Sequence, residues 1–516
     1  MKNCKTKRAR QVQPIAALLL AVATTGASAV GGKPAIDRDT VVFAIAGDIG
    51  NLDAQVASTG DSHRYAIAVN DTLYGFDAKG NLEPRVASGV KISDDRMRYT
   101  FTLRKDVRFH NNALLTAKDV KFSLERVLKP ETRSTRRPNF APVVDSVTAP
   151  DDSTVVVQLK KADGAFLNKV AGYLFLVPKE YVESLPTPEA FAKAPIGCGP
   201  FRFVDQKIGQ SVELERFDGY YGKKPGIKRL IYRLIPEPAS RVNALMAGEV
   251  DLADSIMPAD VARLKKLPGL SVSPVKIGSP LMVRLYSNVP GTPLSNPKVR
   301  VALNIGYDAN AIIKNVLHGI GEPMATLVSA VYPYGNDPAL KPYAYDPARA
   351  KKLLAEAGYP NGFDTDIYSA SVMPRDVTEA LVAYWSTIGV RAKVKFIDYA
   401  AWARLDNTHQ GGPMSVTRFP NAIYDPSHPI GGGVVKAGTW SDYYNAEVEK
   451  LFAEAEGLTD RDARDKAFRR ITRILHDDAH SVPITELFIV FAKDSQLDWE
   501  QQPGSGYYNL REIAWK

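Results

Sequence analysis

The stretch that decides the fold is Tyr99 to Leu128, YTFTLRKDVRFHNNALLTAKDVKFSLERVL. Apolar and polar residues alternate from Tyr99 to Leu103, and this period of two predicts a half-buried β-strand. Thr116 is a candidate helix N-cap with Asp119 three residues on, and apolar residues at helical spacing follow it. A strand followed by a helix predicts a mixed α/β architecture.

The same alternation of elements continues towards the C-terminus. Asp346-Pro347 indicates a helix cap followed by proline at the first helical position, and this helix is expected to end at Gly358. From Val390 to Phe396 apolar residues alternate with the basic residues Arg391, Lys393 and Lys395, which predicts a strand. Thr459 is expected to open a last long helix with one apolar stripe.

The first 29 residues have the features of a signal peptide. Residues 1–10 carry five basic residues and no acid, and an unbroken apolar run follows from Ile15 to Ala23. A helix of that length spans about 14 Å, roughly half of a bilayer core, which argues against a membrane anchor. Because Ala27-Ser28-Ala29 supplies small residues before a cleavage point, we expect cleavage after Ala29 and release into the periplasm.

Composition excludes several classes of protein. The leader holds five of the 66 Lys and Arg and none of the 57 Asp and Glu, so its removal lowers the net charge from +9 to +4. That balance, without a basic run interleaved with aromatic residues, predicts no nucleic-acid partner. Cys4 leaves with the leader, so Cys198 has no partner for an intramolecular disulfide. No later apolar stretch approaches 18 residues, and we expect a soluble mature chain.

The sequence also lacks common catalytic motifs. It contains no Gly-x-Ser-x-Gly elbow, no phosphate-binding loop and no Cys-x-x-Cys pair. His476 and His480 share one helical face and could bind zinc or nickel. Histidine near a helix C-terminus is equally favoured by the helix dipole without any metal. The sequence therefore predicts a protein that is not an enzyme and has no metal site and no cofactor.

The stretch from Tyr99 to Leu128 resembles the signature of the family 5 extracellular solute-binding proteins, which include dipeptide- and oligopeptide-binding proteins. The resemblance covers essentially the whole mature chain, and it departs from the family's pattern at Cys198, where a threonine is usual. The further matching stretches are PIGCGPF from Pro195, ASRVNALMAGEVDLAD from Ala239, Asn288, NPKVRVALNIGYD from Asn296 and YDPARAKKLLAEAGYPNGF from Tyr345.

This resemblance implies an α/β fold of the periplasmic-binding-protein type, with two lobes built from three domains. The chain would pass between the lobes near Pro280–Asn288 and near Ala479–Glu486, and these crossings would act as a hinge. The implied boundaries are the signal peptide at 1–29, a discontinuous domain I at 30–62, 177–283 and 484–516, an inserted domain II at 63–176, and domain III at 284–483.

The resemblance also implies a function. The chain would be the periplasmic substrate-binding component of an ABC transporter, a monomer that captures a peptide or peptide-like small solute in the interdomain cleft. It would deliver that solute to the transmembrane subunits of the ABC permease. Alternatives within binding proteins are receptors for a nickel complex, haem, an opine or an oligosaccharide. The alternative from another class is a periplasmic hydrolase or chaperone.

One position separates this chain from the peptide-binding relatives that it resembles. In those relatives, the aspartate that pairs with the ligand's amino terminus lies three residues before an acidic-Pro pair. Here that pair is Asp425-Pro426, and Ala422 stands in the aspartate's place. Nearby Arg418 offers a fork of donors suited to a carboxylate or phosphate. We hypothesise that the ligand is anionic or otherwise modified.

Six residues are expected at the ligand site, and each has a structural alternative. Thr59 and Asp61 lie in the stretch Ser58 to Asp61, which matches the segment that contacts ligand in the family, but such a loop could equally cap the next helix. Arg418 could be a surface ion-pair residue. Aromatic residues in this region could wall the cleft or belong to a core. The predicted ligand-binding residues are Thr59, Asp61, Arg418, Tyr424, Asp425 and Trp440.

Overall fold

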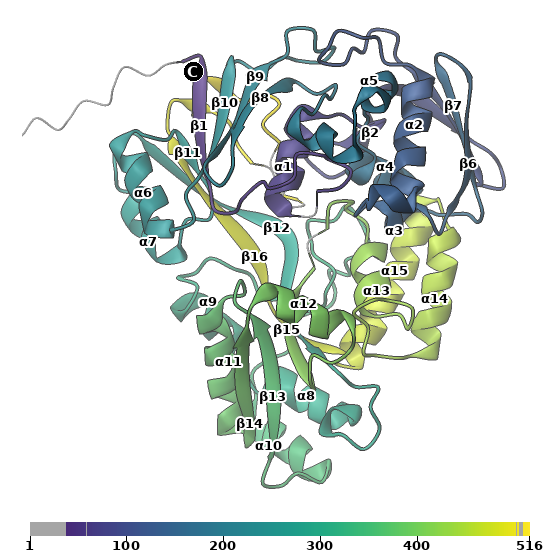
Figure 1. The fold of residues 1–516 in the computed structure, drawn as a ribbon. Helices are drawn as coiled ribbons and strands as arrows, with labels where there is room; N and C mark the ends of the chain where they lie inside the picture. Colours follow the sequence, from purple (N-terminus) through teal and green to yellow (C-terminus); the bar gives the residue numbers. More distant parts are fainter. Residues whose placement is uncertain (1–37, 58, 420, 502, 505–508) are drawn as a thin grey trace, which may run out of the picture. The chain divides into compact units, whose positions relative to one another are not determined.

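A ten-stranded mixed sheet is the largest sheet of this computed structural model, which describes residues 38–57, 59–419, 421–501, 503–504 and 509–516. The strand order is β14-β13-β15-β12-β16-β11-β1-β10-β9-β8 (Figure 1). The predicted signal peptide lies outside the described residues. The strands are β1 (Thr40–Ile45), β8 (Phe201–Lys207), β9 (Ser211–Arg216), β10 (Arg229–Leu234), β11 (Leu252–Ala253), β12 (Leu270–Leu285), β13 (Phe363–Ala370), β14 (Val390–Ile397), β15 (Met414–Arg418) and β16 (Ser481–Asp494).

Two long strands connect the two halves of this sheet. β12 and β16 pair with each other in antiparallel fashion from Leu270↔Asp494 to Arg284↔Ser481. One end of β16 also pairs with β11, whereas the other end of β12 pairs with β15. The ladder is irregular between Lys276 and Pro280, where Gly278 has a φ of 59°. The predicted lobe crossings fall on these two strands, and their role as a hinge stays a prediction.

A four-stranded antiparallel sheet, with the order β4-β5-β7-β6, forms a separate layer. β5 buries Tyr99, Phe101 and Leu103, which confirms the predicted alternation. Burial of Phe101 and Leu103 stabilises the fold by about 1.5–3 kcal/mol each. The strands of this sheet and of two short pairs are β4 (Ala87–Ile92), β5 (Arg98–Leu103), β6 (Val144–Asp151), β7 (Thr154–Leu159), β2 (Tyr74–Phe76), β3 (Leu82–Pro84), β17 (Leu497–Asp498) and β18 (Ala514–Trp515).

Helices begin where the sequence supplies caps. The Asp119 carboxylate accepts the Thr116 N–H at 2.9 Å ahead of α2, and Asp346 accepts the Arg349 N–H at 2.9 Å ahead of α10. The helices are α1 (Gly60–Val69), α2 (Ala117–Leu128), α3 (Arg137–Phe140), α4 (Phe166–Tyr173), α5 (Lys179–Ser184), α6 (Pro238–Ala247), α7 (Pro258–Leu264), α8 (Pro297–Ile305), α9 (Ala309–Asn315), α10 (Pro347–Glu356), α11 (Arg375–Thr387), α12 (Tyr399–Asn407), α13 (Ser427–Gly433), α14 (Ala446–Gly457) and α15 (Arg461–Asp477).

The predicted start of the last long helix is wrong by one residue. Asp460, not Thr459, is the N-cap of α15, because its carboxylate accepts the Ala463 N–H at 2.9 Å. Of the residues described, none belongs to a helix that is both long and apolar enough to cross a bilayer.

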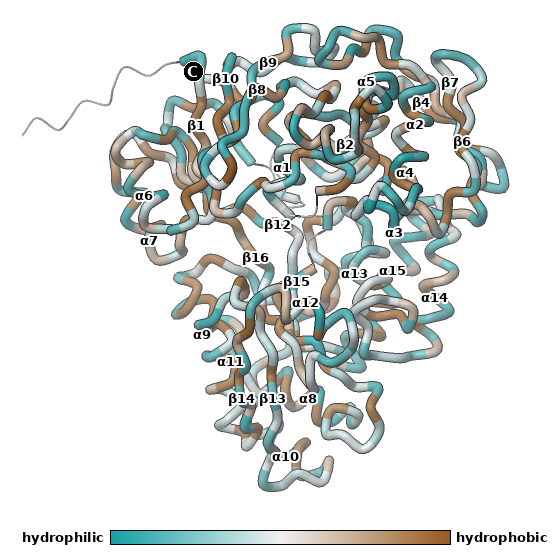
Figure 2. The backbone as a smooth tube through the Cα atoms, viewed as in Figure 1, coloured by the Kyte–Doolittle hydropathy of each residue, from teal (hydrophilic) through white to brown (hydrophobic). Residues whose placement is uncertain are grey.

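Several hydrophobic cores hold these elements. One surrounds the four-stranded sheet and α2, and it also includes Ala422 and Ile423 from far along the chain. A second buries Trp385 between the helices α8 and α11 and the strands β13 to β15, and a third lies under β1, β8 to β10 and α1. A fourth joins α13, α14 and α15. Figure 2 shows hydrophobic segments concentrated along strands such as β1 and β10, and hydrophilic segments in many peripheral loops.

Candidate functional site

A cavity with a volume of about 610 Å³ is walled by segments that lie far apart in the sequence. Helix α1, the β2–β3 hairpin, the end of α4, residues 422 and 424, and the C-terminal segment all contribute to it. Its size falls within the range of about 300–1,000 Å³ that is typical of small-molecule sites. The residues used below are His63, Asp71, Phe76, Asp77, Glu83, Arg85, Gly172, Lys223, Ala422, Tyr424, Asp498, Trp499, Glu500, Arg511 and Glu512.

A buried ion pair closes one side of this cavity. Asp71 and Arg511 are 440 residues apart in the chain, and Arg511 Nη1 donates to Asp71 Oδ2 at 3.0 Å. The hydroxyls of Tyr220 and Tyr221 donate to the same carboxylate oxygen at 3.0 and 2.8 Å. Arg511 also donates to two backbone carbonyls at 3.1 Å. Burial raises the pKa of Tyr220 to about 12, so it remains a donor at neutral pH. The pair fixes the wall.

The other two cations of the lining are also paired. Arg85 forms an ion pair with Glu83, and Lys223 Nζ lies 2.7 Å from Glu512 Oε2. The Asp77 carboxylate accepts hydrogen bonds from its own turn. The described lining therefore presents a solute with carboxylates at Asp498 and Glu500 and with the aromatic rings of Phe76, Tyr424 and Trp499. It combines polar and apolar surfaces.

A single histidine lines the described part of this cavity. The His63 ring lies 5.3 Å from the Phe175 ring, and Arg136 Nη2 lies 3.2 Å from His63 Nδ1. Burial, followed by the charges of Arg136 and Arg64, lowers the pKa of His63 well below its usual value. The imidazole is therefore neutral at physiological pH.

Tyr424 lies in the wall of the cavity, where the sequence predicted a wall. Its ring centroid is 4.9 Å from that of Phe76, and its φ of 51° is in the left-handed region. A Cβ at Gly80 would lie 2.6 Å from the Tyr424 ring, so the ring packs directly on that backbone. Ala422, two residues earlier, lines the same cavity.

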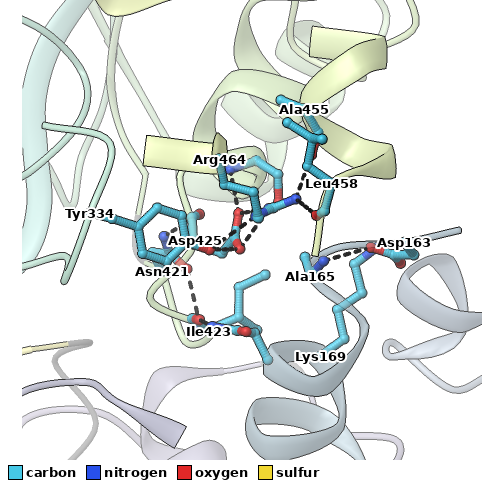
Figure 3. A network of polar contacts seen from close by, with 12 residues as sticks. Asp163, Ala165, Lys169, Tyr334, Asn421, Ile423, Asp425, Ala455, Leu458 and Arg464 are labelled. Carbon is cyan, nitrogen blue, oxygen red and sulfur yellow. Dashed lines mark hydrogen bonds and ion pairs between the residues drawn. The ribbon is translucent and has the colours of Figure 1, made fainter. Parts of the chain in front are cut away.

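Asp425, between the cavity wall and α13, is fully buried and makes structural contacts. Arg464 Nη2 donates to both of its carboxylate oxygens at 2.8 Å, and Tyr334 donates to Oδ2 (Figure 3). Its Oδ1 also accepts the Ser427 N–H at 2.8 Å. Arg464 holds the pKa of this carboxyl below its usual range against the opposing effect of burial, which is the largest single influence on it. Its predicted contact with a ligand stays a prediction.

Thr59 and Asp61 lie at the start of α1. The Thr59 hydroxyl accepts the Ser62 N–H at 3.1 Å, so Thr59 is the N-cap of α1. Helix capping was the alternative to ligand contact that the sequence left open for this loop. Asp61 pairs with Arg64, which lies 3.0 Å from Asp254. Burial raises the pKa of Asp61 to about 6, although Arg64 opposes that shift. Neither Thr59 nor Asp61 lines the 610 Å³ cavity.

Arg418 and Trp440 also lie outside that lining. Arg418 ends β15 opposite Leu281 of β12, and its side chain is exposed. Trp440 Nε1 donates to Asn407 Oδ1 at 2.6 Å, and its ring is 5.7 Å from the Phe419 ring. Trp440 is half-buried against the core of α13 to α15. The structure thus brings Tyr424 and Ala422 together and places the other predicted residues elsewhere.

The two histidines considered as a metal motif have separate partners. His476 stacks on Tyr343 at 4.6 Å and its Nε2 lies 3.1 Å from the Lys341 carbonyl oxygen. His480 is buried, and its Nδ1 lies 3.3 Å from the Leu475 carbonyl oxygen. Across the described ranges, no three His, Cys, Asp or Glu side chains are grouped so that they could hold a metal ion.

Sequence reasoning missed most of the cavity lining. No local motif marks Asp71, Arg85, Trp499 or Arg511. These residues come together at the cavity only because the chain folds distant segments against one another. A second cavity of about 570 Å³ shares Trp499, Glu500 and Gln501 with the first. The only signal that led to the site was the Asp425-Pro426 pair, which located Ala422 and Tyr424.

Comparisons with known proteins bear on this geometry. Residues 81–435 match the family model described as bacterial extracellular solute-binding proteins, family 5 Middle. Heme-binding protein A of Haemophilus influenzae is 31% identical over 439 residues, covering 78% of this chain and 79% of that protein. The dipeptide-binding protein of Escherichia coli is 27% identical over 511 residues, covering 90% of this chain and 91% of that protein.

Solved structures share the fold. The ABC transporter-associated periplasmic binding protein DppA from Helicobacter pylori, in complex with the peptide STSA, superposes with a TM-score of 0.81 at 26% identity, covering 92% of this chain and 98% of that one. HbpA2 from Haemophilus parasuis superposes with a TM-score of 0.82 at 28% identity, covering 92% and 100%. The predicted α/β fold of the periplasmic-binding-protein type is confirmed.

Proposed function

Because this chain belongs to the bacterial extracellular solute-binding proteins of family 5, we propose that it is the periplasmic receptor of an ABC importer for a peptide or peptide-like solute. The observation that carries the proposal is the cavity of about 610 Å³, whose walls come from distant segments and include Ala422 and Tyr424. A site assembled in this way can surround a solute and release it when the segments separate. The signal peptide is cleaved after Ala29, and the monomer delivers its solute to the permease.

The lining supports binding without catalysis. Among the described residues that form the wall there is no serine or cysteine, and the one histidine, His63, is neutral and buried. A nucleophile beside a base is the usual arrangement for hydrolysis. The carboxylates of Asp498 and Glu500 and the aromatic rings of Phe76, Tyr424 and Trp499 instead suit a solute that has an amino group and apolar parts. An amino end would be held by groups other than position 422, where alanine offers no carboxylate.

Denaturing mass spectrometry of protein purified without refolding tests this proposal. We expect one peptide or peptide-like molecule per chain, and exposure to that molecule should raise the melting temperature of solute-free protein. If haem, an opine, an oligosaccharide or a nickel complex were found at that stoichiometry instead, the protein would be a receptor for that ligand and not for a peptide. Turnover of the bound molecule would favour a hydrolase.

Replacing Tyr424 by alanine should weaken the affinity for the retained solute by about tenfold, because it removes an aromatic face from the cavity wall. Isothermal titration of solute-free protein measures the change. Tyr399→Ala is the control, since Tyr399 is 54% exposed on α12 and lies outside the cavity lining. Equal affinity in the parent and in Tyr424→Ala would remove Tyr424 from the site.

Arg418→Ala tests the hypothesis of an anionic solute. If the guanidinium clamps a carboxylate or phosphate of the solute, its loss should weaken binding by at least about tenfold, because charge-assisted hydrogen bonds are strong. Arg404→Ala, on nearby α12, is a control of the same chemistry. Unchanged affinity of Arg418→Ala for the solute identified by mass spectrometry would end the anion hypothesis and leave the cavity proposal intact.

A further inference from the structure

Helix α4 and the turn before it carry two glycines and an asparagine that lie directly against the backbone of distant segments. Asn168 and Gly172 are four residues apart on α4, so they lie on the same side of the helix, and Gly164 belongs to the turn just before it. The Gly164 N–H donates to the Glu456 carbonyl oxygen at 2.6 Å, and Asn168 Nδ2 donates to the Ile423 carbonyl oxygen at 2.8 Å. We call these three residues the latch face. It belongs to predicted domain II, and its partners belong to predicted domain III.

The approach at the latch face leaves no room for a side chain. A Cβ at Gly164 would lie 1.8 Å from the Leu458 carbonyl oxygen and 2.1 Å from Arg464 Nη1. A Cβ at Gly172 would lie 2.8 Å from the Ala422 carbonyl oxygen. Neither glycine has a left-handed φ, so proximity rather than backbone conformation excludes a side chain at both positions. Close-packed atoms can relieve such an overlap only by moving apart.

A single buried cation organises the facing segments, residues 421–425 and 455–458. Arg464 Nη1 donates to the carbonyl oxygens of Ala455 and Leu458 at 2.6 and 3.1 Å, while its Nη2 binds both carboxylate oxygens of Asp425 (Figure 3). Asn421 Nδ2 donates to the Asp425 carbonyl oxygen at 2.9 Å. The two facing segments are therefore held as one rigid surface.

The same facing segments form part of the cavity wall. Ala422 and Tyr424 line the 610 Å³ cavity, whereas Ile423 between them packs into the core around the four-stranded sheet. The contact of Ile423 with the latch face therefore fixes the positions of Ala422 and Tyr424 in the cavity wall. Gly164 lies outside this cavity lining and affects it only through the contact.

We propose that the latch face and the facing segments form a contact that holds the cleft shut, and that Gly164, Asn168 and Arg464 thereby set solute affinity from outside the cavity. The inference rests on the proposed function, since it assigns a closing contact to that same site. Gly164 and Asn168 act as positioning residues. Ile423 supplies apolar area that is buried when the contact forms, and an exposed rim pair, Lys161 and Glu456 at 3.6 Å, borders it.

Distance measurements between spin labels test the latch without requiring a known solute. Cysteines replacing Lys118 on α2 and Lys450 on α14 place one exposed label on each side of the contact. Cys198 does not compete for the label, because it is buried and burial raises the pKa of its thiol. We expect a short-distance population in the parent, with or without a tryptic digest of casein as solute source.

Gly164→Ala should reduce the short-distance population by at least about tenfold, and it should weaken the affinity for any retained peptide by the same factor. Gly457→Ala is the matched control, since Gly457 ends α14 next to the contact and a Cβ there would meet nothing within 4 Å. Lys161→Glu, at an exposed side chain where folding is not at risk, should shift the distribution the same way but less, and salt should reduce that shift.

Two results would overturn the latch: a parental distance distribution in both Gly164→Ala and Lys161→Glu, or a parent that never populates the short distance. These results differ from a failure of the proposed function. A parent that closes in the distance measurement yet retains no solute in mass spectrometry would count against the proposed function, and with it against a role of the contact in solute affinity, while the closing contact itself would stand.

Discussion

Replacement of Arg464 by alanine should lower the free energy of unfolding by about 3–5 kcal/mol, because it would leave the Asp425 carboxylate buried without a counter-charge. Both side chains are almost completely inaccessible to water, at 2% and 0% exposure. The substitution also removes the donor to the carbonyl oxygens of Ala455 and Leu458. Urea unfolding followed by circular dichroism measures the loss.

The same helix provides the control for this experiment. Arg470 on α15 pairs with Glu447, but the two side chains are 64% and 49% exposed. Arg470→Ala should therefore change the free energy of unfolding by less than about 1 kcal/mol, as exposed ion pairs do. Equal losses of unfolding free energy in the two variants would show that the buried Asp425–Arg464 pair stabilises the fold no more than an exposed ion pair does.

The second large effect concerns pH and a carboxyl between the paired strands. Glu486 of β16 lies opposite Pro280 of β12, is 4% exposed, and its Oε1 accepts the Ser279 N–H at 2.9 Å. Burial raises the pKa of Glu486 from 4.5 to about 7; Ser329, Ser279 and Lys276 oppose the shift, and Glu322 adds to it. The native state therefore binds more protons than the unfolded state between these pH values.

The sign of the effect follows from that difference in bound protons. The stability contributed by protonated Glu486 is complete below about pH 4.5 and is lost as the pH rises through about 7, a total of about 3 kcal/mol. Glu486→Gln keeps an acceptor for Ser279 and cannot ionise. The variant should match the parent near pH 4.5 and be more stable at pH 8, as measured by urea unfolding across this pH range.

Glu322→Gln is the appropriate control for Glu486→Gln. Glu322 lies beside Glu486 and pairs with Lys276 at 2.6 Å, but its side chain is 53% exposed. It should leave most of the pH dependence in place. A Glu486→Gln profile that follows the parent from pH 4.5 to 8 would mean that another group titrates in this window.

The local parts of the fold could be predicted because their causes are local. The alternation from Tyr99 to Leu103 predicted β5, and the carboxylates of Asp119, in the first turn of α2, and of Asp346, just before α10, cap these two helices. Where two capping residues stand next to each other, as at Thr459 and Asp460, the sequence does not say which carries the cap. The order of the ten strands was not predicted, since strand pairing depends on contacts between distant residues, and the resemblance to a family implied only the type of fold.

The site was less predictable because its contacts are distant. Asp425 was expected to meet a ligand, but its partner Arg464 lies 39 residues on and forms a buried pair that no local spacing indicates. Asp71 and Arg511 are separated by 440 residues. Ala422 and Tyr424 lie in the cavity wall, and in the sequence only the adjacent acidic-Pro pair marks their segment; the contact of Tyr424 with a ligand stays a prediction.

The paired strands β12 and β16 have a mechanical consequence. A two-stranded ribbon resists bending within its own plane, because that motion stretches interstrand hydrogen bonds on one edge. Bending perpendicular to the plane requires only small dihedral changes, which are easiest between Lys276 and Pro280, where the ladder is interrupted and Gly278 supplies a permissive backbone. If the predicted hinge lies in this ribbon, its rotation should have a single soft axis, at the interruption between Lys276 and Pro280.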